Sequence, residues 1–296
     1  MPELPNATSD TYTLESPPIK AIKREEYESK IKKEWDILIN RDPSPSEKEV
    51  QKFLEKYPSL VPGAFNITGG ESGHAPKFWG LISQPILPSY YGYIPDFMWI
   101  SKNSSYVQPV FIEIESPRKK YFGAGIDFSA NFNQALGQLE DWKVWISDPA
   151  NQIKFREFYG LNDEPYKRLS FFPAFVLIYG REKELYEKPI GNKRRHEKEK
   201  NDLFIMSFDR LHPRVNWDQF VCLKVKEKNG ASVISVVSVP ETFTLSSNLA
   251  EVRSNYFDLD KAIVNNENIP PQRRDFLIRR LEYWNNWIKM AKNNKS

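Results

Sequence analysis

Hydrophobic and polar positions alternate most regularly in the run VFIEIE, residues 110–115. Side chains of a strand point to opposite faces in turn, so the apolar even-numbered residues face one side, and Glu113 and Glu115 face the other. Two acids this close repel each other, and burial without a partner would raise their pKa values or cost free energy. The alternative is an edge strand whose glutamates face water, and this run alone leaves both interpretations open.

Helical spacing of apolar residues marks the other segments. It predicts helices over residues 20–39, 47–58, 131–148 and 270–294. Ser44 or Ser46 is the candidate N-cap of the second helix, and Pro58 ends it. Helices therefore flank the strand-like run on both sides in sequence.

Further strands are predicted around this run. Residues 92–116 indicate a hairpin with SKNSS as its turn, and residues 219–240 indicate a second hairpin around Asn229 and Gly230. The apolar run 171–180 is typical of a central strand covered on both faces, and 201–211 predicts another buried strand. Strands that alternate with helices predict an α/β fold.

Composition excludes some kinds of site but does not identify a function. Lys and Arg exceed Asp and Glu by only three in 296 residues, so global charge does not indicate a nucleic-acid binder. The single Cys222 excludes an internal disulfide and a multi-cysteine zinc site, and His74, His196 and His212 lack metal-site spacing. Carboxylates are then the obvious metal ligands.

Hydropathy and charge also characterise the N-terminus and one basic run of the chain. No apolar run is long enough to cross a bilayer, so we expect a soluble, cytoplasmic protein without membrane partners. Residues 1–18 predict a loose arm or an edge strand, and NKRRHEKEK, residues 192–200, predicts a solvated surface helix because glutamates intersperse its basic residues.

Polar residues in apolar surroundings recur in an informative order. Glu47 opens the second helix, Asp96 stands near the start of the first hairpin strand, Glu113 and Glu115 lie on the next strand, and Gln138 lies beside the apolar stripe of helix 131–148. The hairpin brings Asp96 close to the glutamate pair.

This order resembles the PD-(D/E)XK nuclease core, and IEIESPRKKYF with NQALGQLEDWKVWI resembles the Shedu family of bacterial antiphage nucleases more closely. The resemblance covers roughly residues 45–210. It implies a restriction-endonuclease-like fold, a mixed central sheet flanked by helices, with terminal extensions. The expected organisation is an N-terminal arm and helix over 1–44, a nuclease-like core over 45–215, and a C-terminal hairpin and helix over 216–296 that pack on the core or in an oligomer.

The resemblance also implies a chemistry. Phosphodiester hydrolysis needs an activated water and neutralisation of phosphate charge, which Mg²⁺ or Mn²⁺ held by carboxylates supplies. Asp96 and Glu113 are the implied ligands, the main-chain carbonyl of Ile114 could complete the shell, and Glu47 could bind a second ion or orient the first shell. Glu47 could equally be a helix-terminal charge favoured by the dipole.

Glu115 departs from the superfamily pattern, which usually has lysine at this position. Either Glu115 binds a metal or its water, or Lys119 or Lys120 takes the role of the lysine, or the site is catalytically weakened. Gln138 could bind a metal-bound water or the scissile phosphate, or it could simply be solvated.

The expected function is a metal-dependent DNA endonuclease of antiphage defence that acts on double-stranded phage DNA as a homo-oligomer. The rival is a catalytically inert nuclease-fold module that binds nucleic acid or has a structural or regulatory role. A glycosidase is disfavoured because two acids on one strand cannot easily flank a sugar from opposite faces. Trp284, Trp287 and Arg280 of the last helix suggest an oligomer interface, unless they dock this helix on its own domain.

Overall fold

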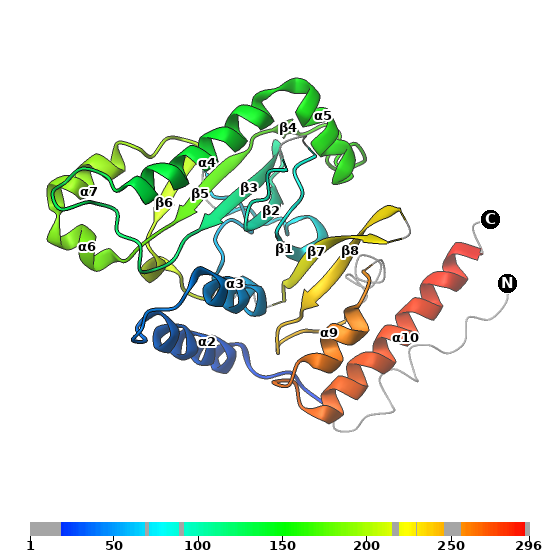
Figure 1. Ribbon diagram of the computed structural model, residues 1–296. Helices are drawn as coiled ribbons and strands as arrows, with labels where there is room; N and C mark the ends of the chain where they lie inside the picture. Colours follow the sequence, from blue (N-terminus) through cyan, green and yellow to red (C-terminus); the bar gives the residue numbers. More distant parts are fainter. Residues whose placement is uncertain are drawn as a thin grey trace.

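A mixed sheet forms the centre of the protein, with helices on both faces (Figure 1). The computed structural model describes residues 19–68, 71–88, 92–214, 219–228, 230–245 and 256–293. The predicted α/β class is confirmed, and the architecture is consistent with a restriction-endonuclease-like core. The predicted N-terminal arm, residues 1–18, lies outside the described residues.

Eight strands make up the sheet, in the order β6-β5-β3-β2-β1-β7-β8, with β4 paired to β3. The strands are β1 (Gly80–Ser83), β2 (Phe97–Lys102), β3 (Tyr106–Ile114), β4 (Ser170–Phe171), β5 (Ala174–Ile178), β6 (Leu203–Met206), β7 (Val221–Lys228) and β8 (Ala231–Ser238). β3, β5 and β6 run parallel, whereas β2 is antiparallel to both β1 and β3. The β7–β8 hairpin extends the same sheet, because β7 pairs with β1 in parallel.

Helices cover the two faces of the sheet through separate apolar clusters. They are α2 (Arg24–Ile39), α3 (Glu47–Lys56), α4 (Ala130–Ser147), α5 (Pro149–Phe158), α6 (Glu182–Glu187), α7 (Pro189–His196), α9 (Leu259–Asn265) and α10 (Pro271–Asn293). α2 and α3 pack on one face, and α4 and α5 pack on the other (Figure 1). No helix in the described part of the chain is both long and apolar enough to span a membrane.

The strand with the two glutamates is central, not an edge. β3 lies between β2 and β5, and Glu113 and Glu115 are 8% and 6% exposed. Ile112 packs in the cluster beneath α2 and α3, and Phe111 packs in the cluster beneath α4. Both faces of β3 are therefore core, and the interpretation as a water-facing edge strand is wrong.

Both predicted hairpins are present. Asn103 begins the β2–β3 turn, and its Oδ1 accepts hydrogen bonds of 2.8 Å from the amides of Ser105 and Tyr106. In the β7–β8 hairpin Lys228 pairs with Ala231, and Gly230 has a φ of +76°, which suits a tight turn. Asn229 itself lies outside the described residues.

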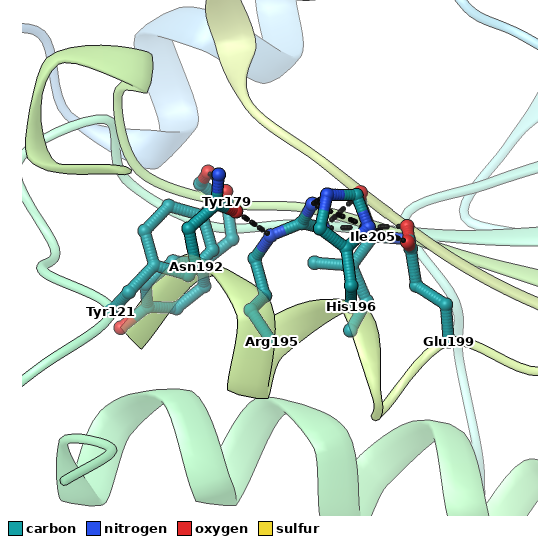
Figure 2. Close-up of polar contacts among 7 residues, drawn as sticks. All are labelled: Tyr121, Tyr179, Asn192, Arg195, His196, Glu199 and Ile205. Atoms are coloured by element: carbon teal, nitrogen blue, oxygen red, sulfur yellow. Dashed lines mark hydrogen bonds and ion pairs between the residues drawn. The ribbon is translucent and has the colours of Figure 1, made fainter. Parts of the chain in front are cut away.

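The basic run 192–200 lies on the surface as predicted, partly as the end of α7, and departs from the prediction at one buried residue. Arg195 of α7 is only 4% exposed, and it donates to the carbonyl of Ile205 on β6 at 2.8 Å and to Asn192 Oδ1 at 3.1 Å (Figure 2). His196 Nδ1 lies 2.8 Å from Glu199 Oε2. Burial of this one arginine anchors α7 to the sheet edge, which the interspersed charges of the run did not indicate.

Candidate active site

Register places two acids opposite each other at one end of the β2–β3 hairpin. Phe97 pairs with Ile112, so the next position puts Asp96, directly before β2, opposite Glu113. The amide of Ile114 donates to Asp96 Oδ2 at 2.8 Å. The hairpin therefore brings Asp96 to the glutamate pair, as its sequence predicted.

Glu113 and Asp96 share a proton in this arrangement. Burial, the charge of Asp96 and a hydrogen bond to its carboxylate raise the pKa of Glu113 to about 10. Burial also raises the pKa of Asp96 to about 6, although the Ile114 amide and the Glu113 hydrogen bond oppose that rise. Two hydrogen-bonded carboxyl groups do not both ionise, and the larger rise in pKa favours the proton on Glu113.

The N-terminus of α3 adds a fourth acid. Ser46 is the N-cap, and it forms a capping box with Glu49, which fixes where α3 begins. Glu47, the first helical residue, is solvent-exposed but hydrogen-bonded to Glu115. Desolvation, Asp96 and Glu115 raise its pKa to about 7. We call Glu47, Asp96, Glu113 and Glu115 the acid corner.

Lys119 supplies the positive charge of the acid corner. Its Nζ donates to Glu115 Oε2 in a short ion pair that is partly buried. The backbone brings it there, because the Lys119 amide donates to the carbonyl of Ser116 at 2.9 Å and turns the chain directly after β3. A buried carboxylate paired with a cation is the arrangement that the glutamate run required.

Two residues that the sequence did not single out hold this turn in place. Ser116 Oγ donates to the carbonyl of Pro45 at 3.2 Å, which ties the turn to the start of α3. Gly180 has a φ of +56°, and a Cβ there would lie 3.0 Å from the Lys119 carbonyl and 2.9 Å from the Tyr121 ring. Neither contact has a sequence signal, since each joins segments far apart in the chain.

Two other candidates lie apart from these ion pairs. Lys120 is exposed, and its carbonyl, not its ammonium group, is engaged, by Ser129 Oγ at 2.7 Å and by the Tyr179 hydroxyl at 3.2 Å. Gln138 is exposed on α4. Of the two lysines that could replace the motif lysine, only Lys119 contacts the acid corner.

The acid corner has the donor chemistry of a hard divalent cation. All four of its side chains offer carboxylate oxygens, which are the ligands that Mg²⁺ and Mn²⁺ prefer. Within the described ranges, no three His, Cys, Asp or Glu side chains are already arranged as metal ligands. The residues fit a cation by their chemistry, provided that the shared proton leaves and the side chains adjust.

Comparison with known families supports the sequence resemblance. The family model described as "Shedu protein SduA, C-terminal" matches residues 44–212, more than half of the chain. No curated protein matches the chain. The matched range runs from the segment before α3 through the β2–β3 hairpin, α4 and β6, and it includes every residue of the acid corner. A role in antiphage defence is what this match suggests. Because the match covers more than half of the chain, the chain belongs to the Shedu family.

Proposed function

We propose that the protein is a divalent-metal-dependent endonuclease that cleaves phosphodiester bonds of double-stranded DNA in antiphage defence. The observation that carries this proposal is the buried Asp96–Glu113 pair, which shares a proton beside the Glu115–Lys119 ion pair. Perturbed carboxyl groups clustered in this way are typical of catalytic sites. DNA as the substrate rests on membership of the Shedu family.

Each residue of the acid corner has a role in this proposal. Asp96 and Glu113 would hold a Mg²⁺ or Mn²⁺ ion, which would supply charge neutralisation at the phosphate and a more acidic water. Glu115 keeps the Lys119 ammonium at the corner, where it can orient the attacking water or the phosphate. Glu47, with its pKa near 7, can exchange a proton with solvent at neutral pH.

A cleavage assay on linear and circular double-stranded DNA tests this function, with Mg²⁺, with Mn²⁺ and with EDTA. Asp96→Asn and Glu113→Gln preserve shape but remove the ionisable carboxyl, and both should reduce cleavage by at least about 100-fold. The matched control is Glu187→Gln, an exposed glutamate of α6 whose nearest cation is 3.9 Å away. Wild-type cleavage by folded Glu113→Gln protein would overturn the proposal.

The second candidate is an inert module that binds DNA without cutting it. It is favoured by one observation, the lack of a ready metal-ligand group in the part of the chain that the structure describes. DNA binding with no cleavage under any divalent cation would support it. Metal-dependent cleavage that disappears in Asp96→Asn would exclude it.

We also propose that α10 contributes to a homo-oligomer. Trp284 packs against the core of its own chain, and Arg280 donates to the Leu245 carbonyl at 3.0 Å, so these two residues dock the helix. Trp287 and Met290 remain 43% and 47% exposed one turn further along. Light scattering at micromolar concentration tests the proposal, since Trp287→Glu should reduce the assembly of a multimeric wild type. A monomeric wild type would contradict it.

A further inference from the structure

A cavity of about 610 Å³ lies at the other end of the β2–β3 hairpin from the acid corner. Lys102 ends β2 and lines this cavity, whereas Asp96 stands directly before β2. We call this cavity the Lys77 pocket, and the lining residues that matter are Lys77, Phe78, Trp79, Lys102, Tyr166 and Tyr256. It shares no lining residue with the acid corner.

Lys77 carries a desolvated positive charge into this pocket. Its Nζ lies 4.4 Å from the centroid of the Tyr166 ring and 5.0 Å from that of Phe78, and it donates to the Gly160 carbonyl at 3.0 Å. Burial lowers the pKa of Lys77, with only the more distant charge of Asp163 opposing it. Among the described residues no carboxylate lies within ion-pair distance of Lys77, so an external anion would offset this desolvation.

The rest of the lining has the same character. Lys102 Nζ lies 5.7 Å from the Tyr166 ring, on the same aromatic side chain that contacts Lys77. The described lining residues include no Asp or Glu. Aromatic faces beside two ammonium groups are suited to a ligand that is planar at one end and anionic at the other.

The backbone of the lining is strained as well. Phe78 and Trp79 have φ values of +65° and +48°, a conformation that non-glycine residues rarely adopt. Two contacts hold it, the Tyr256 hydroxyl donating to the Phe78 carbonyl and the Trp79 amide donating to the Pro76 carbonyl at 3.1 Å. Such strain concentrates at functional sites, and here it fixes Phe78 at the wall of the cavity, while the Trp79 ring packs against Phe220.

We propose that the Lys77 pocket binds a nucleoside phosphate, with the base against the aromatic side chains and the phosphates at Lys77 and Lys102. A volume of about 610 Å³ lies within the range of small-molecule sites. The pocket is separate from the proposed nuclease site and adds a nucleotide-responsive function to it. The ligand is a free nucleotide, and a nucleotide within a DNA strand is the other source of the same chemistry.

Calorimetric titration with ATP in the presence of EDTA tests this site, since EDTA removes any cation bridge and prevents metal-dependent cleavage. Lys77→Met keeps the aliphatic stem and should weaken ATP binding about tenfold or more, the usual effect of losing one charged hydrogen bond. Lys102→Met should weaken it about threefold to tenfold. The control is Lys183→Met, whose side chain is 86% exposed on α6, and it should bind as wild type.

Titrations with parts of ATP test which chemical class of ligand the Lys77 pocket recognises. Adenosine and tripolyphosphate should each bind at least about tenfold more weakly than ATP, because each lacks half of the recognised group. Equal binding of tripolyphosphate would overturn the proposal, as would no ATP binding at millimolar concentration. A short single-stranded oligonucleotide that binds when ATP does not would also overturn it. Full retention of ATP affinity in folded Lys77→Met protein would place the nucleotide elsewhere and reject the Lys77 pocket.

Discussion

The two ends of the β2–β3 hairpin hold partly or fully desolvated ionisable groups of opposite kind, acidic at one end and basic at the other. At the acid corner, burial raises the pKa of Glu113 to about 10, and at the Lys77 pocket burial lowers the pKa of Lys77. The acid corner compensates internally, through the proton shared with Asp96 and through the ion pair of Glu115 with Lys119. Within the described part of the chain, the ammonium group of Lys77 contacts a carbonyl oxygen and aromatic rings and has no carboxylate at ion-pair distance.

From this difference we infer that the acid corner suits a cation and that the Lys77 pocket suits an anion. Desolvation disfavours the charged form of any group, so a shifted pKa at either end marks a place where an ion of opposite charge is stabilising. In the two proposals, a cation replaces the proton of Glu113 and an anion binds at Lys77.

We expect the largest loss of DNA cleavage in variants of Glu115 and Lys119, and a much smaller loss in a variant of Lys120. Lys119→Ala should reduce DNA cleavage by about 10³-fold if Lys119 orients the water or phosphate, and Glu115→Ala should do the same by releasing Lys119. The reduction of the cleavage rate in Lys120→Ala should be at least about tenfold smaller than in Lys119→Ala. Lys120 is exposed, and its ammonium group is unpaired within the described residues. Rates under single-turnover conditions measure this. A larger loss in Lys120→Ala than in Lys119→Ala would move the lysine role to Lys120.

The next effect is the pH dependence of stability without metal. Glu113 holds its proton more tightly when folded, so its contribution is complete below its ordinary pKa of 4.5 and is lost as pH rises towards about 10. The free energy of unfolding should therefore fall between pH 5 and pH 9, by at most about 1.4 kcal/mol per pH unit from this group. Urea unfolding in EDTA measures the slope.

Glu113 and Lys77, at the two ends of the hairpin, should change the free energy of unfolding with pH in opposite directions. Glu113→Gln should flatten the fall, because the group no longer titrates. The Lys77 contribution has the opposite sign, since a lysine with a lowered pKa makes the folded state gain stability as pH rises towards the ordinary value of 10.5. A slope unchanged in Glu113→Gln would contradict the shared proton.

Metal binding should stabilise the folded protein through the acid corner. At a free Mg²⁺ or Mn²⁺ concentration of 100 times Kd, the gain is about 2.7 kcal/mol, which raises the melting temperature by several degrees. The gain should increase from pH 6 to pH 8, because the cation displaces protons. Differential scanning calorimetry measures it. An unchanged midpoint over millimolar metal would count against the cation site, and Lys77→Met should retain the full shift.

The smallest expected effect concerns the start of α3. Ser46→Ala removes the capping box, and it should destabilise the protein by about 1 kcal/mol in urea unfolding. Ser46→Asn should restore most of that loss, since asparagine also caps well. If fraying moves Glu47 away from Glu115, the DNA cleavage rate should fall in Ser46→Ala as well. A loss of stability with no change in rate would confine Glu47 to a structural role.

Much of the fold and part of the acid corner follow from local pattern. Period-two alternation predicted the β2–β3 hairpin, and the same pairing put Asp96 opposite Glu113. Helical periodicity predicted α4, and a capping signal at Ser44 or Ser46 predicted the start of α3, for which the structure shows Ser46 as the N-cap. These features depend on residues close in sequence, for which propensity and pattern suffice.

Other features depended on contacts between distant segments. The burial of Arg195 against β6 could not be deduced from a run that reads as a solvated helix. The sequence left the replacement of the motif lysine open between Lys119, Lys120 and no lysine at all. The turn after β3 brings Lys119 to Glu115, and the exposure of Gln138 places its side chain towards solvent.

By itself, the sequence determined which residues carry ionisable groups and which strand and helix hold them. Only the tertiary structure decided that β3 is central, so that Glu113 loses water and shares a proton with Asp96. It also decided that the loop before β1 meets Tyr166 and Tyr256, which makes the Lys77 pocket. The physical reason is that desolvation depends on what covers a group from every side, and the covering residues come from segments far apart in the chain.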